Sequence, residues 1–84
     1  MSLYATPAKL AEELGYDKST VYKRIKGIKG EIGKRYGQYA VIGSRVNKAV
    51  FLDYEKYQKA LKDQTQRRFV PEFDIEEAKR YVII

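Results

Sequence analysis

The chain has 84 residues, of which 44% are hydrophobic and 33% are charged, and its net charge is +6. This length suits one small domain with a modest core and leaves little room for a separate catalytic domain. The chain contains no cysteine and no histidine, so disulfides are excluded, and we expect neither a metal site nor a cofactor. The acids are scattered without an evident pair, so we do not expect an enzyme.

The apolar stretches are short throughout the chain. None approaches the length that spans a bilayer, and the N-terminus lacks the basic and then apolar pattern of a signal peptide. We therefore expect a cytoplasmic protein that has no membrane partner.

Two short helices joined by a tight turn are predicted in the first third of the chain. Thr6 can cap the free amides of the first helix, and Pro7 suits its first turn because proline has no N–H group. Gly15 ends this helix, since glycine adopts the left-handed conformation at little steric cost. Asp17 can cap the second helix, which is predicted over residues 17–28.

The spacing of five residues in this stretch resembles the helix-turn-helix of DNA-binding regulators, whose second helix enters the major groove: Leu10, Ala11, Leu14, Gly15 and Val21. The resemblance implies that Ala11 lets the helices approach and that Val21 packs the second helix on the first. Tyr16 stands where a smaller aliphatic residue is usual, and Arg24 where an apolar one is usual, so Ile25 must supply that contact. We expect Arg24 to pair with an acid of the first helix. An ordinary helical hairpin is the alternative.

Basic residues concentrate on and just after the second helix. Residues 18–48 contain nine Lys or Arg and one acid, Glu31. This concentration is typical of a surface that binds phosphate backbones. The alternative is a solvated basic surface that keeps the protein in solution.

The outward face of the second helix contains candidates for reading bases. Helical geometry directs Ser19 and Lys23 away from the inward Val21. Lys23 can donate to guanine, Ser19 and Thr20 can bond to either type of base, and Tyr22 can contact a phosphate or a thymine methyl. The DNA-binding residues predicted here are Lys18, Ser19, Thr20, Tyr22, Lys23, Lys26 and Lys29.

Three glycines, Gly27, Gly30 and Gly33, lead us to expect the end of the second helix near residue 28. Their spacing matches neither the P-loop nor the dinucleotide fingerprint, and no strand is predicted before them. We therefore expect no nucleotide cofactor.

A β-hairpin is predicted next. Residues 38–42 and 49–52 are rich in aromatic and β-branched side chains, and they flank a turn over residues 43–48. After a helix-turn-helix, such a hairpin resembles the wing of a winged helix, which would reach the adjacent minor groove or its phosphates. A structural hairpin with a basic tip is the alternative. The DNA-binding residues predicted at the tip are Arg45, Asn47 and Lys48.

A third helix is predicted over residues 54–62, capped by Asp53. From about residue 3 to 64, the order of helix-turn-helix, hairpin and helix resembles the excisionase-like branch of the MerR superfamily. The resemblance implies an α+β, mostly helical fold: a winged helix-turn-helix with a two-stranded β-hairpin wing in a DNA-binding domain over residues 1–64. The long dimerising helix and effector domain of full-length MerR regulators are missing, which favours a compact DNA-bending or accessory factor.

The remaining residues, 65–84, are predicted to form a tail with a short helix. Asp74 and Glu77 form a capping box before that helix, and residues 81–84 all have large apolar bodies. The tail either folds back on the core or presents residues 69–84 for self-association or a partner protein.

The leading hypothesis is a sequence-specific protein that binds double-stranded DNA. The resemblance implies a phage, plasmid or other mobile element, with an excisionase-like recombination directionality factor or a small transcriptional regulator as the role. One alternative is a winged-helix protein adaptor or a replication accessory protein. Its contact surface would be the apolar tail and four tyrosines: Tyr36, Tyr39, Tyr54 and Tyr57. Another alternative is single-stranded nucleic acid stacked on exposed tyrosines.

Overall fold

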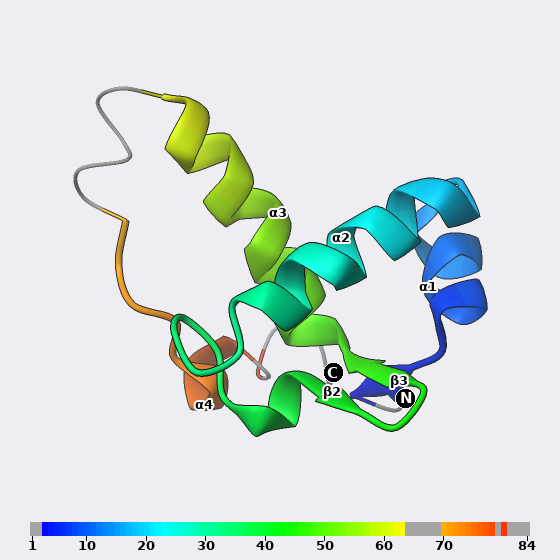
Figure 1. Cartoon of the computed structure of the whole chain (residues 1–84), viewed down its shortest axis with the longest axis horizontal. Coiled ribbons are helices and arrows are strands. Elements are labelled where there is room, and N and C mark those ends of the chain that lie inside the picture. Colours follow the sequence, from blue (N-terminus) through cyan, green and yellow to red (C-terminus); the bar gives the residue numbers. More distant parts are fainter. Residues whose placement is uncertain (1–2, 64–69, 79, 81–84) are drawn as a thin grey trace.

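The computed structural model describes residues 3–63, 70–78 and 80, and its elements are mostly helical with a small antiparallel sheet. Figure 1 shows helices α1, α2 and α3 packed together, with the sheet at the N-terminal end of α3. The short helix α4 packs against α3. The α+β, mostly helical class predicted from the sequence is therefore confirmed. The boundary predicted between residues 64 and 65 lies outside the described residues.

Helix α1 spans Pro7–Leu14 and helix α2 spans Lys18–Gly30, and a tight turn joins them. The Thr6 hydroxyl accepts a hydrogen bond from the Lys9 amide, and Gly15 adopts a φ of 71°, so both ends of α1 are as predicted. Asp17 occupies the N-cap position of α2, but its carboxylate makes no capping bond. It accepts the Ser19 hydroxyl instead, at 3.2 Å.

Helix α2 extends two residues beyond the predicted end. Gly27 lies inside it, where a side chain would collide with Tyr54 of α3. The glycine therefore leaves room for the Tyr54 side chain against α2 and does not end the helix.

The sheet contains three strands in the order β1-β3-β2, where two were predicted. Strand β1 (Tyr4–Ala5) and strand β2 (Val41–Ile42) both pair antiparallel with the central strand β3 (Arg45–Asn47). The hairpin turn is only two residues long, because Ile42 pairs directly with Arg45.

Both predicted strands of the hairpin are wrong in part, because residues 38–40 form a 3₁₀ helix, η1 (Gln38–Ala40), and the second strand is misplaced. Residues 49–52 lie in helix α3, which spans Lys48–Lys62 and begins six residues before the predicted start. Its cap is Asn47, whose side-chain oxygen accepts the amides of Ala49 and Val50 at 2.9 and 3.2 Å. Asp53 lies within the helix and pairs with Arg35 instead of capping.

The core gathers side chains from every layer of the fold. Leu10 of α1, Val21 of α2, Val46 of β3 and Phe51 of α3 are each no more than 1% exposed. The inward face predicted for α2 is correct, since Ile25 and Ile28 are buried beside Val21. The packing fixes α2 with its other side facing solvent.

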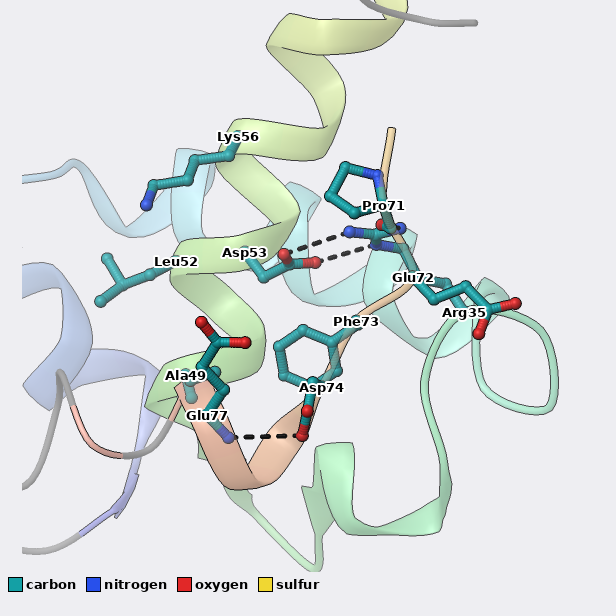
Figure 2. Close-up of a pocket in the computed structure, with 11 residues that line it drawn as sticks. Arg35, Ala49, Leu52, Asp53, Lys56, Pro71, Glu72, Phe73, Asp74 and Glu77 are labelled. Atoms are coloured by element: carbon teal, nitrogen blue, oxygen red, sulfur yellow. Dashed lines mark hydrogen bonds and ion pairs between the residues drawn. The ribbon is translucent and has the colours of Figure 1, made fainter. Parts of the chain in front are cut away.

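A C-terminal strap, which we define as residues 70–78, lies against α3 on the side that contains Asp53. Phe73 packs against the core, and its ring lies 5.2 Å from that of Tyr36 in an edge-on arrangement. The Arg35 guanidinium donates two hydrogen bonds to Asp53 and a third to the Pro71 carbonyl. Figure 2 shows Arg35, Asp53 and Phe73 around a pocket between the strap and α3. The described part of the tail therefore folds back on the domain.

The strap ends in helix α4, Ile75–Ala78. The Asp74 carboxylate accepts the amides of Glu76 and Glu77, which is the Asp74 half of the predicted capping box. The apolar residues 81–84 proposed as a partner surface lie outside the described residues.

Candidate nucleic-acid interface

Helix α2 presents a continuous solvent-facing surface opposite its core residues. We name it the basic face, and its exposed members are Lys18, Ser19, Tyr22, Lys23, Lys26 and Lys29. Thr20, at the edge of this surface, is half-buried. The helix has 13 residues, which corresponds to about 20 Å of length at the usual helical rise. All seven residues predicted to bind DNA from this segment therefore lie on one helix, and six of them are exposed together.

The basic face is positively charged along its whole length. Helix α2 contains no acidic residue. Among the described residues, no ion pair joins Lys18, Lys23, Lys26 or Lys29 to an acid. These four ammonium groups remain available to an external anion, and the helix dipole adds positive character at the Lys18 end.

Arg24 is the one cation of α2 that does not belong to this surface. Its guanidinium lies 4.5 Å from the centre of the Tyr16 ring and forms an ion pair with Glu55 of α3. The Tyr16 hydroxyl donates to the same carboxylate oxygen. Tyr16 in turn packs near Phe51, with 6.4 Å between ring centroids. We name Tyr16, Arg24 and Glu55 the clamp.

The clamp explains both departures from the helix-turn-helix pattern. Tyr16 and Arg24 are large and polar where small or apolar residues are usual, but each contacts the other, and Glu55 satisfies both. The prediction that Arg24 pairs with an acid of the first helix is wrong, because the pairing acid comes from α3. The clamp ties the turn, α2 and α3 together, and so it helps to fix the rotation of α2 about its own axis.

The hairpin presents a smaller surface than predicted. Its tip, which we define as residues 42–45, is exposed and contains one cation, Arg45. Gly43 adopts a φ of 61°, which lets a two-residue turn reverse the chain.

Two residues predicted at the tip are buried elsewhere. Asn47 is 1% exposed because it caps α3, and Lys48 is 7% exposed as the first residue of that helix. The Lys48 ammonium lies 2.9 Å from a carboxylate oxygen of Glu13 in α1. The prediction that Asn47 and Lys48 extend from the hairpin toward DNA is therefore wrong, since both stabilise the junction of α1, β3 and α3.

The tyrosines that the structure describes do not form an exposed surface. Tyr36 is 2% exposed, and its hydroxyl donates to Asp53 at 2.8 Å. Burial, reinforced by this carboxylate, raises the pKa of Tyr36 above its ordinary value. Tyr39, Tyr54 and Tyr57 are half-buried. Among the described tyrosines only Tyr22 is exposed, so the tyrosine surface expected of an adaptor or of a single-strand stacking platform is not present there.

One exposed residue beside the predicted site was not identified from the sequence. Ile42 belongs to a predicted strand that is not part of the predicted site, and 57% of it is exposed at the hairpin tip. Alternation along a strand could have indicated it, but β2 has only two residues and contains no alternation to follow.

The described residues contain neither a group of three acids arranged to bind a metal ion nor a helix that is long and apolar enough to cross a membrane. Comparison with protein-family models, curated proteins and solved structures finds no match for this chain.

Proposed function

We propose that the protein is a sequence-specific, double-stranded DNA-binding protein of the winged helix-turn-helix type. In this proposal the basic face of α2 enters the major groove, and the β2–β3 hairpin is the wing beside it. The observation that carries the proposal is the acid-free, solvent-facing row of four lysines on α2, interleaved with Ser19 and Tyr22.

The chemistry of this row suits both parts of DNA recognition. Lysine ammonium groups bind phosphates and displace their counterions, which supplies affinity for any sequence. Lys23, Ser19 and Tyr22 also present donors and an aromatic ring to base edges, which supplies discrimination. The clamp supports this role because it holds α2 in one orientation, and a fixed orientation is required for reading bases.

The resemblance to excisionase-like proteins supports a role on a mobile element. A recombination directionality factor and a small transcriptional regulator both require a compact reader of duplex DNA. The fold alone does not distinguish these roles, because function depends on the site and not on the architecture.

The proposal is tested by selection from a random duplex library at about physiological salt, followed by titration of the enriched sequence and a scrambled one. We expect a motif, and at least about a thousandfold tighter binding to it than to the scrambled duplex. Lys62→Ala is the matched control, because it also removes one lysine from a helix, but Lys62 lies in the last turn of α3, which the proposal does not assign to DNA. Absence of an enriched motif would contradict the proposal.

Two substitutions separate reading from anchoring. Lys23→Ala should weaken the enriched site more than the scrambled duplex, because a base contact is lost. Lys29→Ala should weaken both duplexes alike and reduce the slope of log K against log salt by about one unit, because one phosphate contact is lost. Equal losses on both duplexes from both variants would contradict the assignment of the reading surface.

A further inference from the structure

Ile42 is a large hydrophobic residue that is exposed to solvent. It is 57% exposed, and among the large hydrophobic residues of the described segments only Tyr22, at 58%, is comparably open to solvent. Tyr22 lies in the middle of the basic face. Among the described residues, the two most exposed large apolar side chains therefore lie on the two surfaces that the proposed function assigns to DNA.

The hairpin connects Ile42 to the core through the neighbouring residue pair. The neighbouring pair, Val41 opposite Val46, connects the tip to the core, and Val46 is 1% exposed. A β-branched side chain has few rotamers, so Ile42 loses little conformational entropy when a partner covers it.

The charge around Ile42 favours a polyanion over a basic or neutral protein surface. Residues 32–52 contain no acidic residue. Arg45 is directly opposite Ile42 in the ladder, and no ion pair among the described residues involves it. Lys48 forms an ion pair with Glu13, so Arg45 is the cation that is exposed next to Ile42.

An apolar side chain beside an arginine matches the chemistry of the minor groove. Its walls present phosphates to a cation, and its floor and sugar edges present C–H surface. Arginine is attracted to the negative potential of narrow, A·T-rich minor grooves. Isoleucine is among the residues that proteins insert as wedges between base steps there.

We propose that Ile42 and Arg45 form a two-residue minor-groove probe, in which Arg45 enters an A·T-rich groove and Ile42 packs against its sugar and base edges. This inference rests on the proposed function, which places duplex DNA against α2. It differs from a purely ionic wing contact because it assigns part of the affinity to apolar burial at the hairpin tip.

The first test measures DNA affinity as a function of salt for the full chain. Ile42→Thr should weaken binding about fivefold at every salt concentration, because apolar burial is lost and no charge is removed. Arg45→Ala should reduce the salt slope by about one unit. Leu61→Ala is the matched control, since it removes another exposed apolar side chain, in the last turns of α3, and should leave affinity unchanged.

The second test identifies the groove. In the enriched site, base pairs flanking the α2 contacts are changed from A·T to G·C or to inosine·cytosine, which lacks the guanine amino group in the minor groove. Wild-type protein should bind A·T and inosine·cytosine sites alike and G·C sites more weakly, because the amino group obstructs the probe. Ile42→Thr should reduce this difference.

The outcomes distinguish the inference from the function on which it rests. If Lys23→Ala abolishes discrimination while Ile42→Thr binds like wild type, the probe is wrong and the DNA-binding function stands. If A·T and G·C flanks bind equally, minor-groove contact is also overturned. If the wild-type chain selects no motif, both proposals fail, and the exposed tip becomes a candidate surface for a protein partner.

Discussion

Gly27 lies against the side chain of Tyr54, which belongs to α3. A Cβ atom at this position would overlap the hydroxyl group and ring carbon of Tyr54. Gly27→Ala should therefore destabilise the protein by about 1 kcal/mol, because the strain of moving Tyr54 exceeds the gain in helix propensity. Thermal or urea unfolding measures the effect.

Gly30 provides the control for that substitution. It lies in the same helix, a Cβ atom added to it would meet no other atom within 4 Å, and its φ is not positive. Gly30→Ala should stabilise the protein by about 0.5 kcal/mol through helix propensity alone. Similar effects from both substitutions would contradict the close approach of Tyr54 to α2.

Glu13 gives the stability of the fold an acid dependence. The hydrogen bond from Lys48 lowers the pKa of the Glu13 carboxyl below its ordinary value of 4.5. The folded state thus binds this proton less tightly than the unfolded state does. The contribution of the pair is complete above the unfolded pKa and is lost as pH falls through the lower, folded pKa.

The free energy of unfolding of wild type should therefore exceed that of Glu13→Gln at pH 7, and the difference should shrink below about pH 4.5. Urea titrations at several pH values measure it. Glu12→Gln is the matched control, because Glu12 is the exposed neighbour of Glu13 and forms no ion pair with a described residue. A difference that stays constant down to about pH 3 would show that the Lys48 contact has no effect on the titration.

At the scale of elements, the junction of β3 and α3 depends on one residue. Asn47 is at once the last residue of β3 and the cap of α3. Asn47→Ala should lower the free energy of unfolding by about 1 kcal/mol or more, because two amides lose their acceptor. The folded Asn47→Ala variant should bind DNA as tightly as wild type. Arg45→Ala should do the opposite: it should weaken DNA binding and leave the free energy of unfolding unchanged. Loss of DNA affinity by folded Asn47→Ala would show that Asn47 does belong to the DNA-binding surface.

The first two helices are predictable from the sequence because their signals are local. The Thr6 cap, Pro7 and the Gly15 end all depend on residues within one turn of the helix terminus. The face of α2 follows in the same way, since three buried residues at helical spacing determine which side is exposed. These signals account for the agreement between the predicted and the observed solvent-facing side of α2.

The start of α3 is not predictable by the same reasoning. Residues 48–51 are all buried, so this turn shows no amphipathic pattern, and Val50 and Phe51 have high strand propensity. Asn47 offers a cap signal, but Asp53 offers another one. Tertiary burial decides between them, and it places Asn47 and Lys48 in the core instead of at the predicted site.

The clamp cannot be predicted from the sequence, for a different reason. Tyr16 and Arg24 are recognisable only as departures from a pattern, and Glu55 lies 31 residues beyond Arg24. Nothing local indicates that the three meet. A non-local partner can therefore make an unusual residue compatible with a familiar arrangement of helices.

At the scale of the whole molecule, the C-terminal strap is part of the folded domain. Phe73 contacts Tyr36 and Tyr39, with 6.3 Å between the ring centroids of Phe73 and Tyr39. Phe73→Ala should lower the free energy of unfolding by about 2 kcal/mol, less than for a fully buried phenylalanine because the ring is half-buried. Pro71→Ala should have a smaller effect, because Arg35 bonds to the backbone carbonyl there.

Chemical denaturation of both variants, with DNA binding measured in parallel, tests this view of the strap. We expect Phe73→Ala to leave DNA affinity unchanged while it is folded. If Phe73→Ala and wild type unfold at the same urea concentration, residues 70–78 do not stabilise the domain, and the predicted division after residue 64 is favoured.

The strand order has a consequence for how the chain folds. Strand β3 pairs with β2 across a two-residue turn, but it pairs with β1 across the whole segment over residues 6–44, which includes α1 and α2. The hairpin closes a short loop, whereas the pairing of β1 closes a long one, which has a larger entropic cost. We therefore expect the amide of Lys48, which bonds to the Leu3 carbonyl, to gain protection from hydrogen exchange late in refolding, after the helices have formed.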